Sequence, residues 1–196
     1  MTAPPSRRQQ TRSHNQDKLV AAARQVFATK GLRDASIQDI VEHSGLSRGT
    51  FYNYLGSKEA AFEAVAAQLV VEIADRISAV RRQATDARSF VVEPFRAMVA
   101  VLAQDAQTLS LVRLNGAEFR AVLTGPAHVG SLEADLKRDL DAAVRGELLP
   151  AHRTDWMAAA MVGATLEVVT RVSEDEEVES IGDFLGALFL SALQGL

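Results

Sequence analysis

The stretch SIQDIVEHSGLSRGTFYNYLGSKE, residues 36–59, decides the fold of the N-terminal part of the chain. It predicts two short helices, and the first opens on a serine N-cap, Ser36, with an acidic residue, Asp39, three positions later, as in a capping box. Gly45 can adopt the positive φ that turns the chain sharply, and Leu46 can fill the angle between the helices. The spacing therefore predicts a helix-turn-helix.

The second helix of this motif, residues 48–55, has two different faces. Phe51 and Leu55 lie one turn apart and are expected to pack into the core. The other face carries a cation, hydroxyls, an amide and a glycine that lets the backbone approach phosphate: Arg48, Gly49, Thr50, Tyr52, Asn53 and Tyr54. This face fits the major groove of DNA. Arg48 could pair with guanine and Asn53 with adenine, and the sequence leaves open which residue reads which base.

Two further serines are expected at helix starts where phosphates can dock. Ser47 and Ser57 as N-caps leave backbone N–H groups facing outward, and Lys58 would add a positive charge to the second site. Taken singly, these residues have structural explanations: a tyrosine such as Tyr52 is often half-buried, and an arginine at a helix start is often solvated. Their coincidence with short capped helices and a turn glycine favours nucleic-acid binding.

Charge is distributed unevenly along the chain. Residues 1–60 carry nine basic and five acidic side chains, a net charge of +4, while residues 61–196 carry a net charge of −8. A positive head on a negative body is expected if the head alone approaches a polyanion, because phosphate neutralisation is local. Chance clustering with a basic tail is the alternative explanation.

Composition excludes several classes of protein. The 196 residues include no cysteine, which removes disulfide frameworks, thiolate metal sites and thiol nucleophiles. No segment has the length and apolarity of a signal peptide or a membrane span, so we expect a cytoplasmic protein. The histidines are scattered, and no P-loop, dinucleotide or nucleophile-elbow glycine pattern occurs. We expect no enzyme activity, no cofactor and no metal site, and we interpret the acidic run 174–179 as a solvated loop rather than a cation site.

The whole chain is predicted to be helical, because apolar residues recur every three or four positions and sustained period-two runs are missing. Residues 1–15 are polar and basic and are expected to be disordered. Helices are expected at about residues 17–30, 37–43, 48–55, 57–82, 90–103, 108–122, 129–148, 153–172 and 181–193.

The N-terminal stretches KLVAAARQVFATKGL and ASIQDIVEHSGLSRGTFYNYLGSKEAAF resemble the DNA-binding domain of the TetR family of transcriptional regulators. The matching positions are Phe27, Lys30, Gly31, Ile40, Gly45, Ser47, Gly49, Thr50, Tyr52, Ser57, Lys58 and Glu59. The resemblance covers about residues 17–62. Leu55 stands where the family usually has Phe, Ala61 where a larger aliphatic residue is usual, and Gln16 where an arginine is frequent.

The resemblance implies an all-α homodimer with an N-terminal three-helix DNA-binding domain and a C-terminal helical domain for ligand binding and dimerisation. The implied divisions are a basic arm at 1–15, a helix-turn-helix domain at 16–62 and an effector and dimerisation domain at 63–196. The implied DNA contacts are Ser36, Ser47, Arg48, Gly49, Thr50, Tyr52, Asn53, Tyr54 and Lys58. Arg7, Arg8 and Arg12 either add contacts to the minor groove or backbone or belong to a disordered tail. Two related recognition helices imply a palindromic operator with half-sites about 34–36 Å apart, or multiples of that.

The last two predicted helices are expected to form the dimer interface. Small residues such as Ala158, Ala160 and Gly163 allow close helix approach, and the final helix is apolar on more than one face. An intramolecular core without a partner is the alternative. An effector pocket is then expected among the middle helices, with Phe90, Phe95, Met98, Arg113, Asn115, Phe119, His128 and Trp156 as candidate lining residues, although a surface charge or a core aromatic explains each one singly.

These observations together predict a homodimeric repressor that binds a palindromic operator and is released by a small apolar or amphipathic effector. The helix at 57–82 would link the pocket to the DNA-binding helices, so a ligand that displaces it would weaken operator binding by about 1–3 kcal/mol. An activator, a DNA-binding regulator without an effector, and an all-α enzyme recruited to DNA are the alternatives.

Overall fold

The computed structural model describes residues 7–124, 132–172 and 178–195, and in these ranges the chain is helical without strands. The helices are α1 (Arg7–Asp34), α2 (Ile37–Ser44), α3 (Arg48–Tyr54), α4 (Lys58–Arg81), α5 (Ala87–Leu102), α6 (Ala106–Leu114), α7 (Gly116–Thr124), α8 (Leu132–Arg145), α9 (Thr154–Arg171) and α10 (Val178–Gln194). The prediction of an all-α fold is confirmed.

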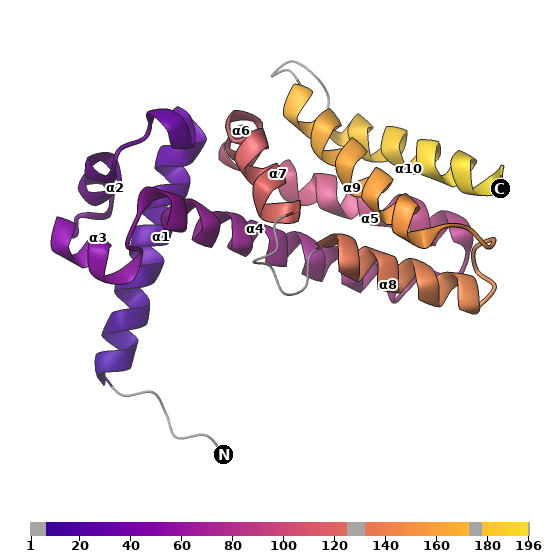
Figure 1. The fold of residues 1–196 in the computed structure, drawn as a ribbon, viewed down its shortest axis with the longest axis horizontal. Helices are drawn as coiled ribbons and strands as arrows, with labels where there is room; N and C mark the ends of the chain where they lie inside the picture. Colours follow the sequence, from indigo (N-terminus) through magenta and orange to yellow (C-terminus); the bar gives the residue numbers. More distant parts are fainter. Residues whose placement is uncertain (1–6, 125–131, 173–177, 196) are drawn as a thin grey trace.

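The first three helices form a head at one end of the molecule, and α4 runs from this head into the body (Figure 1). The head buries Phe27 of α1, Ile40 of α2 and Phe51 of α3, and all three side chains are fully inaccessible to solvent. Phe62 in the first turns of α4 completes this core, with its ring centroid 5.6 Å from that of Phe27. Head and body therefore share one continuous helix.

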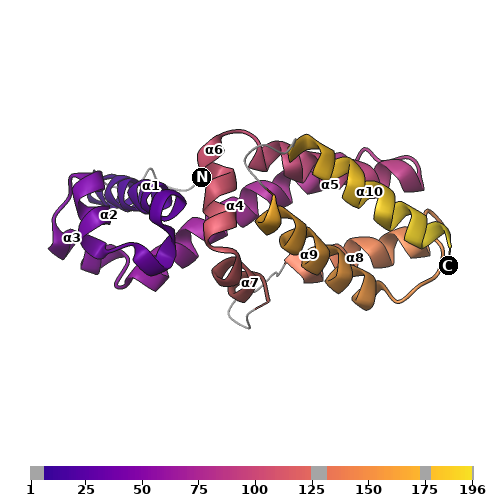
Figure 2. The same cartoon turned by 90° about the horizontal axis from the view of Figure 1, so that it is seen from above.

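The body consists of helices that extend away from the head. Figure 2 shows α5 and α10 along one side, α8 and α9 along the other, and α6 and α7 next to the head. In α10, the buried residues Ile181, Leu185 and Phe189 recur every four positions, and Phe189 stacks on Phe95 of α5 at 5.6 Å between ring centroids. On the opposite face of α10, the large apolar side chains of Phe184 and Leu188 are exposed.

The structure differs from the sequence prediction at several helix boundaries. α1 begins at Arg7, so residues 7–15 continue the helix instead of forming a disordered arm. α5 begins at Ala87, because Asp86 and Ser89 form a capping box. The single helix expected at 108–122 is divided at Asn115, whose backbone leaves the helical region with φ −126° and ψ 32°. The expected boundary at residue 62 falls inside α4, which is continuous across it.

Candidate nucleic-acid interface and ligand cavity

The turn between α2 and α3 is fixed by local hydrogen bonds. Ser36 accepts a hydrogen bond from the backbone N–H of Asp39, and the Asp39 carboxylate accepts one from the backbone N–H of Ser36. Gly45 ends α2 in the left-handed conformation with φ 66°, a backbone geometry that side chains with a Cβ disfavour. Ser47 then caps α3 by accepting from the backbone N–H of Thr50 at 3.1 Å. The predicted helix-turn-helix is therefore present in full.

The Asp39 carboxylate of α2 also forms an ion pair with α1, which connects two helices of the head. Lys30 Nζ of α1 donates to Asp39 Oδ1 at 2.7 Å. This hydrogen bond, followed by those from Ser36, lowers the pKa of Asp39 from 3.8 to about 2. The carboxylate is consequently charged throughout the physiological range and holds α2 against α1.

The face of α3 that the sequence assigned to DNA is exposed. Ser47, Arg48, Gly49, Tyr52 and Asn53 are open to solvent, while Thr50 and Tyr54 are half-buried. Tyr52 is 45% exposed. Its hydroxyl accepts from Arg48 Nη2 at 3.4 Å, and the guanidinium carbon of Arg48 lies 5.8 Å from the ring centroid. Arg48 and Tyr52 thus form one exposed unit, with Phe51 on the opposite side of α3 buried in the core.

Two of the expected DNA contacts have an internal role in this structure. Lys58 Nζ donates to the backbone carbonyls of Arg33 at 3.2 Å and Ala35 at 2.8 Å. The ammonium group therefore ties the start of α4 to the end of α1. The hydroxyl of Ser36 is engaged with Asp39, so the oxygen that would face a phosphate already serves the helix cap.

A row of aromatic rings connects the head to the body. The ring centroid of Phe62 lies 5.6 Å from that of Phe27 and 5.3 Å from that of Phe119 in α7, both in edge-to-face geometry. The three rings therefore form a continuous row of contacts from α1 through α4 to α7.

Buried polar contacts reinforce the same junction. Asn115, which is fully buried, donates through Nδ2 to the carbonyls of Phe27 at 3.1 Å and Leu111 at 2.8 Å, and its Oδ1 accepts from the N–H of Leu32 at 2.6 Å. Arg24 of α1 donates to the hydroxyl of Thr108 in α6 at 2.7 Å. Asn115 therefore joins the head to the body and is not part of a pocket.

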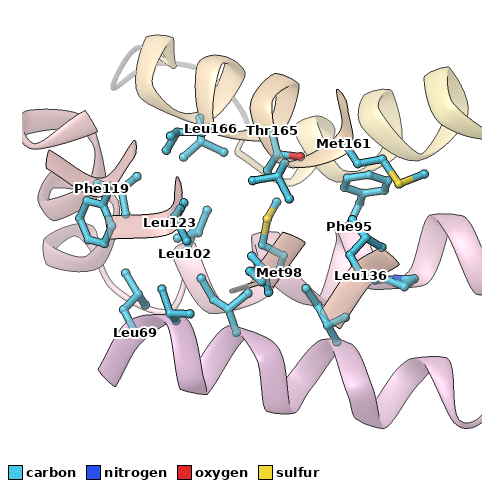
Figure 3. A pocket seen from close by; sticks show the side chains of 18 of the residues that line it. Leu69, Phe95, Met98, Leu102, Phe119, Leu123, Leu136, Met161, Thr165 and Leu166 are labelled. Atoms are coloured by element: carbon cyan, nitrogen blue, oxygen red, sulfur yellow. The ribbon is translucent and has the colours of Figure 1, made fainter. Parts of the chain in front are cut away.

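A cavity of about 110 Å³ lies in the body between α4, α5, α6, α7, α8 and α9. Figure 3 shows Leu69 and Phe119 at one end of it, Phe95 and Leu136 at the other, and Met98 and Thr165 between them. Arg81 and Thr165 are the polar residues of its wall, and the remaining lining side chains are apolar. The arrangement suits a small apolar molecule with few polar groups.

Arg81 stands at the C-terminal end of α4 with a partly satisfied guanidinium. Its Nη1 donates to Asp139 Oδ2 of α8 at 2.8 Å, and its guanidinium carbon lies 5.6 Å from the ring centroid of Phe90. Its Nε is buried without a hydrogen-bond partner. Burial lowers the pKa of Arg81 from its usual value, and the hydrogen bond that Arg81 donates to Asp139 opposes that shift.

Some of the candidate pocket residues line the cavity, and others lie elsewhere in the structure. Phe95, Met98 and Phe119 line the cavity. Phe90 is buried under Arg81 outside the lining, and Arg113 lies in a polar hollow at the junction of head and body. Trp156 is 67% exposed on α9, where Arg153 lies 4.2 Å above its ring, so the expectation that it lines the pocket is corrected. His128 lies outside the described residues.

The side of the cavity formed by α4 was not among the residues predicted from the sequence. Leu69, Ile73, Ile77 and Arg81 are spaced by four residues and face the cavity together. The sequence predicts a helix at 57–82, but apolar residues that pack against a neighbour and apolar residues that line a cavity recur with the same helical period. The arginine that ends this stripe is the one signal that could have distinguished the two.

In the part of the chain that the structure describes, no helix combines the length and the apolarity needed to cross a membrane.

Comparisons with known proteins agree with this architecture. The family described as "Bacterial regulatory proteins, tetR family" matches residues 19–65. The chain is 44% identical over 61 residues to the uncharacterized HTH-type transcriptional regulator YvdT of Bacillus subtilis (strain 168), and that match spans 31% of each chain. It is 22% identical over 175 residues to the HTH-type transcriptional repressor KstR2 of Rhodococcus jostii (strain RHA1), covering 81% of this chain and 84% of that protein.

The fold as a whole is also shared with solved structures. The fatty acid degradation regulator FadR from Bacillus halodurans superposes with a TM-score of 0.76 at 19% identity, covering 97% of both chains. A helix-turn-helix head with an exposed recognition helix, on an all-α body, defines a DNA-binding transcriptional regulator. Together with the family match at residues 19–65, these likenesses support a TetR-family regulator.

Proposed function

We propose that this protein is a cytoplasmic, homodimeric repressor that binds a palindromic operator and is released by a small apolar or amphipathic effector, without enzymatic activity of its own. The observation that carries the proposal is the connection between two sites. Phe119 lines the cavity and contacts Phe62, which contacts Phe27 in the core of the DNA-binding head. A ligand that moves Phe119 therefore acts on the position of α3.

The DNA contacts in this proposal are the exposed face of α3 and the caps around it. In this proposal Arg48 and Asn53, which are exposed, contact base edges. The proposed contacts to phosphates or neighbouring groups are Ser36, Ser47, Gly49, Thr50, Tyr52, Tyr54 and Lys58. Lys58 already donates hydrogen bonds to the carbonyls of Arg33 and Ala35. In this proposal it contacts a DNA phosphate in addition to those two bonds.

The proposed dimer interface is the uncovered face of α9 and α10. Trp156 on α9 and Phe184 and Leu188 on α10 are 67%, 57% and 46% exposed. Ala160 is exposed on α9, and a Cβ at Gly163 would meet nothing within 4 Å. Exposed large apolar side chains and small residues on α9 and α10 favour association with an identical helix pair.

The direction of regulation rests on the relatives. KstR2, which aligns over most of the chain, is named a transcriptional repressor. A second candidate is activation, because the HTH-type transcriptional activator FasR of Mycolicibacterium smegmatis is 24% identical over 156 residues. The position of the operator relative to the promoter distinguishes the two.

A gel-shift titration on the DNA that flanks the gene tests the DNA-binding surface. Arg48→Ala and Asn53→Ala are expected to relax base preference by about 1–3 kcal/mol for each lost base contact. Arg82→Ala, at an exposed arginine on the end of α4, is the matched control and should bind like the wild type. Unchanged operator affinity in a folded Arg48→Ala protein would remove α3 from the proposal.

Sedimentation tests the dimer. The double variant Phe184→Asp/Leu188→Asp is expected to sediment as a monomer, because paired carboxylates cannot be buried in an apolar interface. Val71→Asp is the control, since Val71 is 59% exposed on α4, away from α9 and α10. A monomeric wild type, or a double variant that stays dimeric, would refute this interface.

A further inference from the structure

The size of the cavity limits which molecule can act as the effector, and in this respect the inference rests on the proposed function. The free volume is about 110 Å³. An engineered apolar cavity of about 150 Å³ binds benzene, so a free volume of the same order holds about one six-membered ring. A fused ring system or a long chain would have to displace side chains that are already packed.

The side chains around this free space suit an aromatic ring. Phe119 and Phe95 line it at opposite ends, and Met98 of α5 and Met161 of α9 line it as well (Figure 3). Aromatic rings make favourable edge-to-face contacts with other rings and favourable contacts with thioether sulfur. These four residues therefore favour a flat aromatic ligand.

A charged ligand is disfavoured in the same space. Among the described residues that line the cavity, Arg81 is the only charged one, and its guanidinium already pairs with Asp139 at 2.8 Å. An ion that enters an apolar space loses its hydration, and no unpaired charge among these lining residues offsets that loss. The ligand is therefore expected to be neutral.

Thr165 provides a polar contact for a neutral ligand. It lines the cavity from α9, is half-buried, and projects into the middle of the space opposite Met98 (Figure 3). A threonine hydroxyl can both donate and accept a hydrogen bond. One hydroxyl group on a bound ring can therefore be satisfied at this position.

We infer that the cavity binds a neutral, single-ring aromatic molecule, and that Thr165 favours a ring with one hydroxyl group by hydrogen bonding to it. The ring fits the free volume, its lack of charge matches the wall, and its hydroxyl has a partner in an otherwise apolar space.

Calorimetric titration of the full chain with four probes tests the size and the charge of the ligand. Phenol and 2-naphthol carry the same hydroxyl on one ring and on two fused rings. Toluene and N-methylpyridinium have the same number of non-hydrogen atoms, and the second carries a positive charge. The wild type is expected to bind phenol at least about tenfold more tightly than 2-naphthol, and toluene at least about tenfold more tightly than N-methylpyridinium. These comparisons need no variant, so they do not depend on the folding of a mutant.

Thr165→Val isolates the hydroxyl contact. Valine keeps the shape of threonine and replaces the hydroxyl with a methyl group, so phenol affinity is expected to fall about tenfold while toluene affinity does not fall. Toluene binding also shows that the cavity of the variant is intact. Thr170→Val on the same helix is the matched control, because the Thr170 hydroxyl donates to the carbonyls of Leu166 and Glu167 and lies at the polar hollow instead. It should leave both affinities unchanged.

Four results would overturn the inference: no binding of phenol or toluene to the wild type, binding of 2-naphthol as tight as that of phenol, binding of N-methylpyridinium as tight as that of toluene, or an equal effect of Thr165→Val on phenol and toluene.

A gel shift in the presence of phenol separates this inference from the proposed function. If phenol binds through Thr165 but does not change operator affinity, the effector response fails and the ligand chemistry stands. If phenol releases the operator at the same concentration from the wild type and from Thr165→Val, the effector response stands and the role of Thr165 fails.

Discussion

Asn115 provides the sharpest test of how the head is joined to the body. Its side chain makes three hydrogen bonds, to the carbonyls of Phe27 and Leu111 and from the N–H of Leu32, and it is fully buried. Asn115→Ala removes all three. At about 1 kcal/mol for each net hydrogen bond, the free energy of unfolding should fall by about 3 kcal/mol. That is a large share of the roughly 5–15 kcal/mol that stabilises a typical domain.

Urea unfolding followed by far-UV circular dichroism measures this loss. Asn53→Ala is the matched control: Asn53 is exposed on α3, so the same substitution should change the free energy of unfolding by less than about 0.5 kcal/mol. Asn115→Asp should be at least as destabilising as Asn115→Ala near neutral pH, because a carboxylate oxygen would face the carbonyls of Phe27 and Leu111. A loss below about 1 kcal/mol for Asn115→Ala would show that these bonds do not hold head and body together.

Three further substitutions test other parts of the structure. Gly116→Ala should lower the free energy of unfolding by roughly 1–2 kcal/mol, because its Cβ would lie 2.6 Å from Thr170 Cγ2; Thr170→Ser removes that methyl group and should restore most of the loss in urea unfolding, and a failure to do so would argue against the tight contact of α7 with α9. Asp39→Asn should destabilise the head above pH of about 4, since a carboxyl whose pKa falls from 3.8 to about 2 on folding stabilises the charged, folded form; the difference from wild type in melting temperature should shrink as pH falls from about 4 to 2, and a pH-independent difference would contradict this. Lys58→Ala should lower the free energy of unfolding by about 1–2 kcal/mol through its bonds to the Arg33 and Ala35 carbonyls; weaker operator binding with unchanged stability would instead assign Lys58 to phosphate contact alone.

The helix-turn-helix was predictable from the sequence because its determinants are local. Ser36 and Asp39 cap α2, Gly45 ends it with φ 66° and Ser47 caps α3, and every one of these interactions joins residues at most three positions apart. Capping hydrogen bonds need a serine or an acidic residue at fixed positions, and a left-handed turn favours glycine, so both can be predicted from the order of residue types. The exposed face of α3 follows from the same period, because Phe51 must be buried.

The junction and the cavity depend on contacts between distant residues. Asn115 ends α6 and bonds to Phe27, 88 positions away, in place of continuing the helix that its neighbours favour. Trp156 was expected inside the body, yet the packing of α9 turns it outward to 67% exposure. The helical spacing of apolar residues predicts which side chains are buried. It does not predict whether a buried side chain packs against another helix or lines a cavity.

The sequence by itself determined an all-α chain with a capped helix-turn-helix and a positive head, because capping, turn conformation and charge act over a few residues. The tertiary structure alone decided that α4 carries the cavity wall, that Arg81 ends it with an unpaired Nε–H, and that Phe119, Phe62 and Phe27 connect it to the head. Those features arise where separate helices pack against one another, and the free energy of that packing depends on shapes that no short stretch of sequence contains.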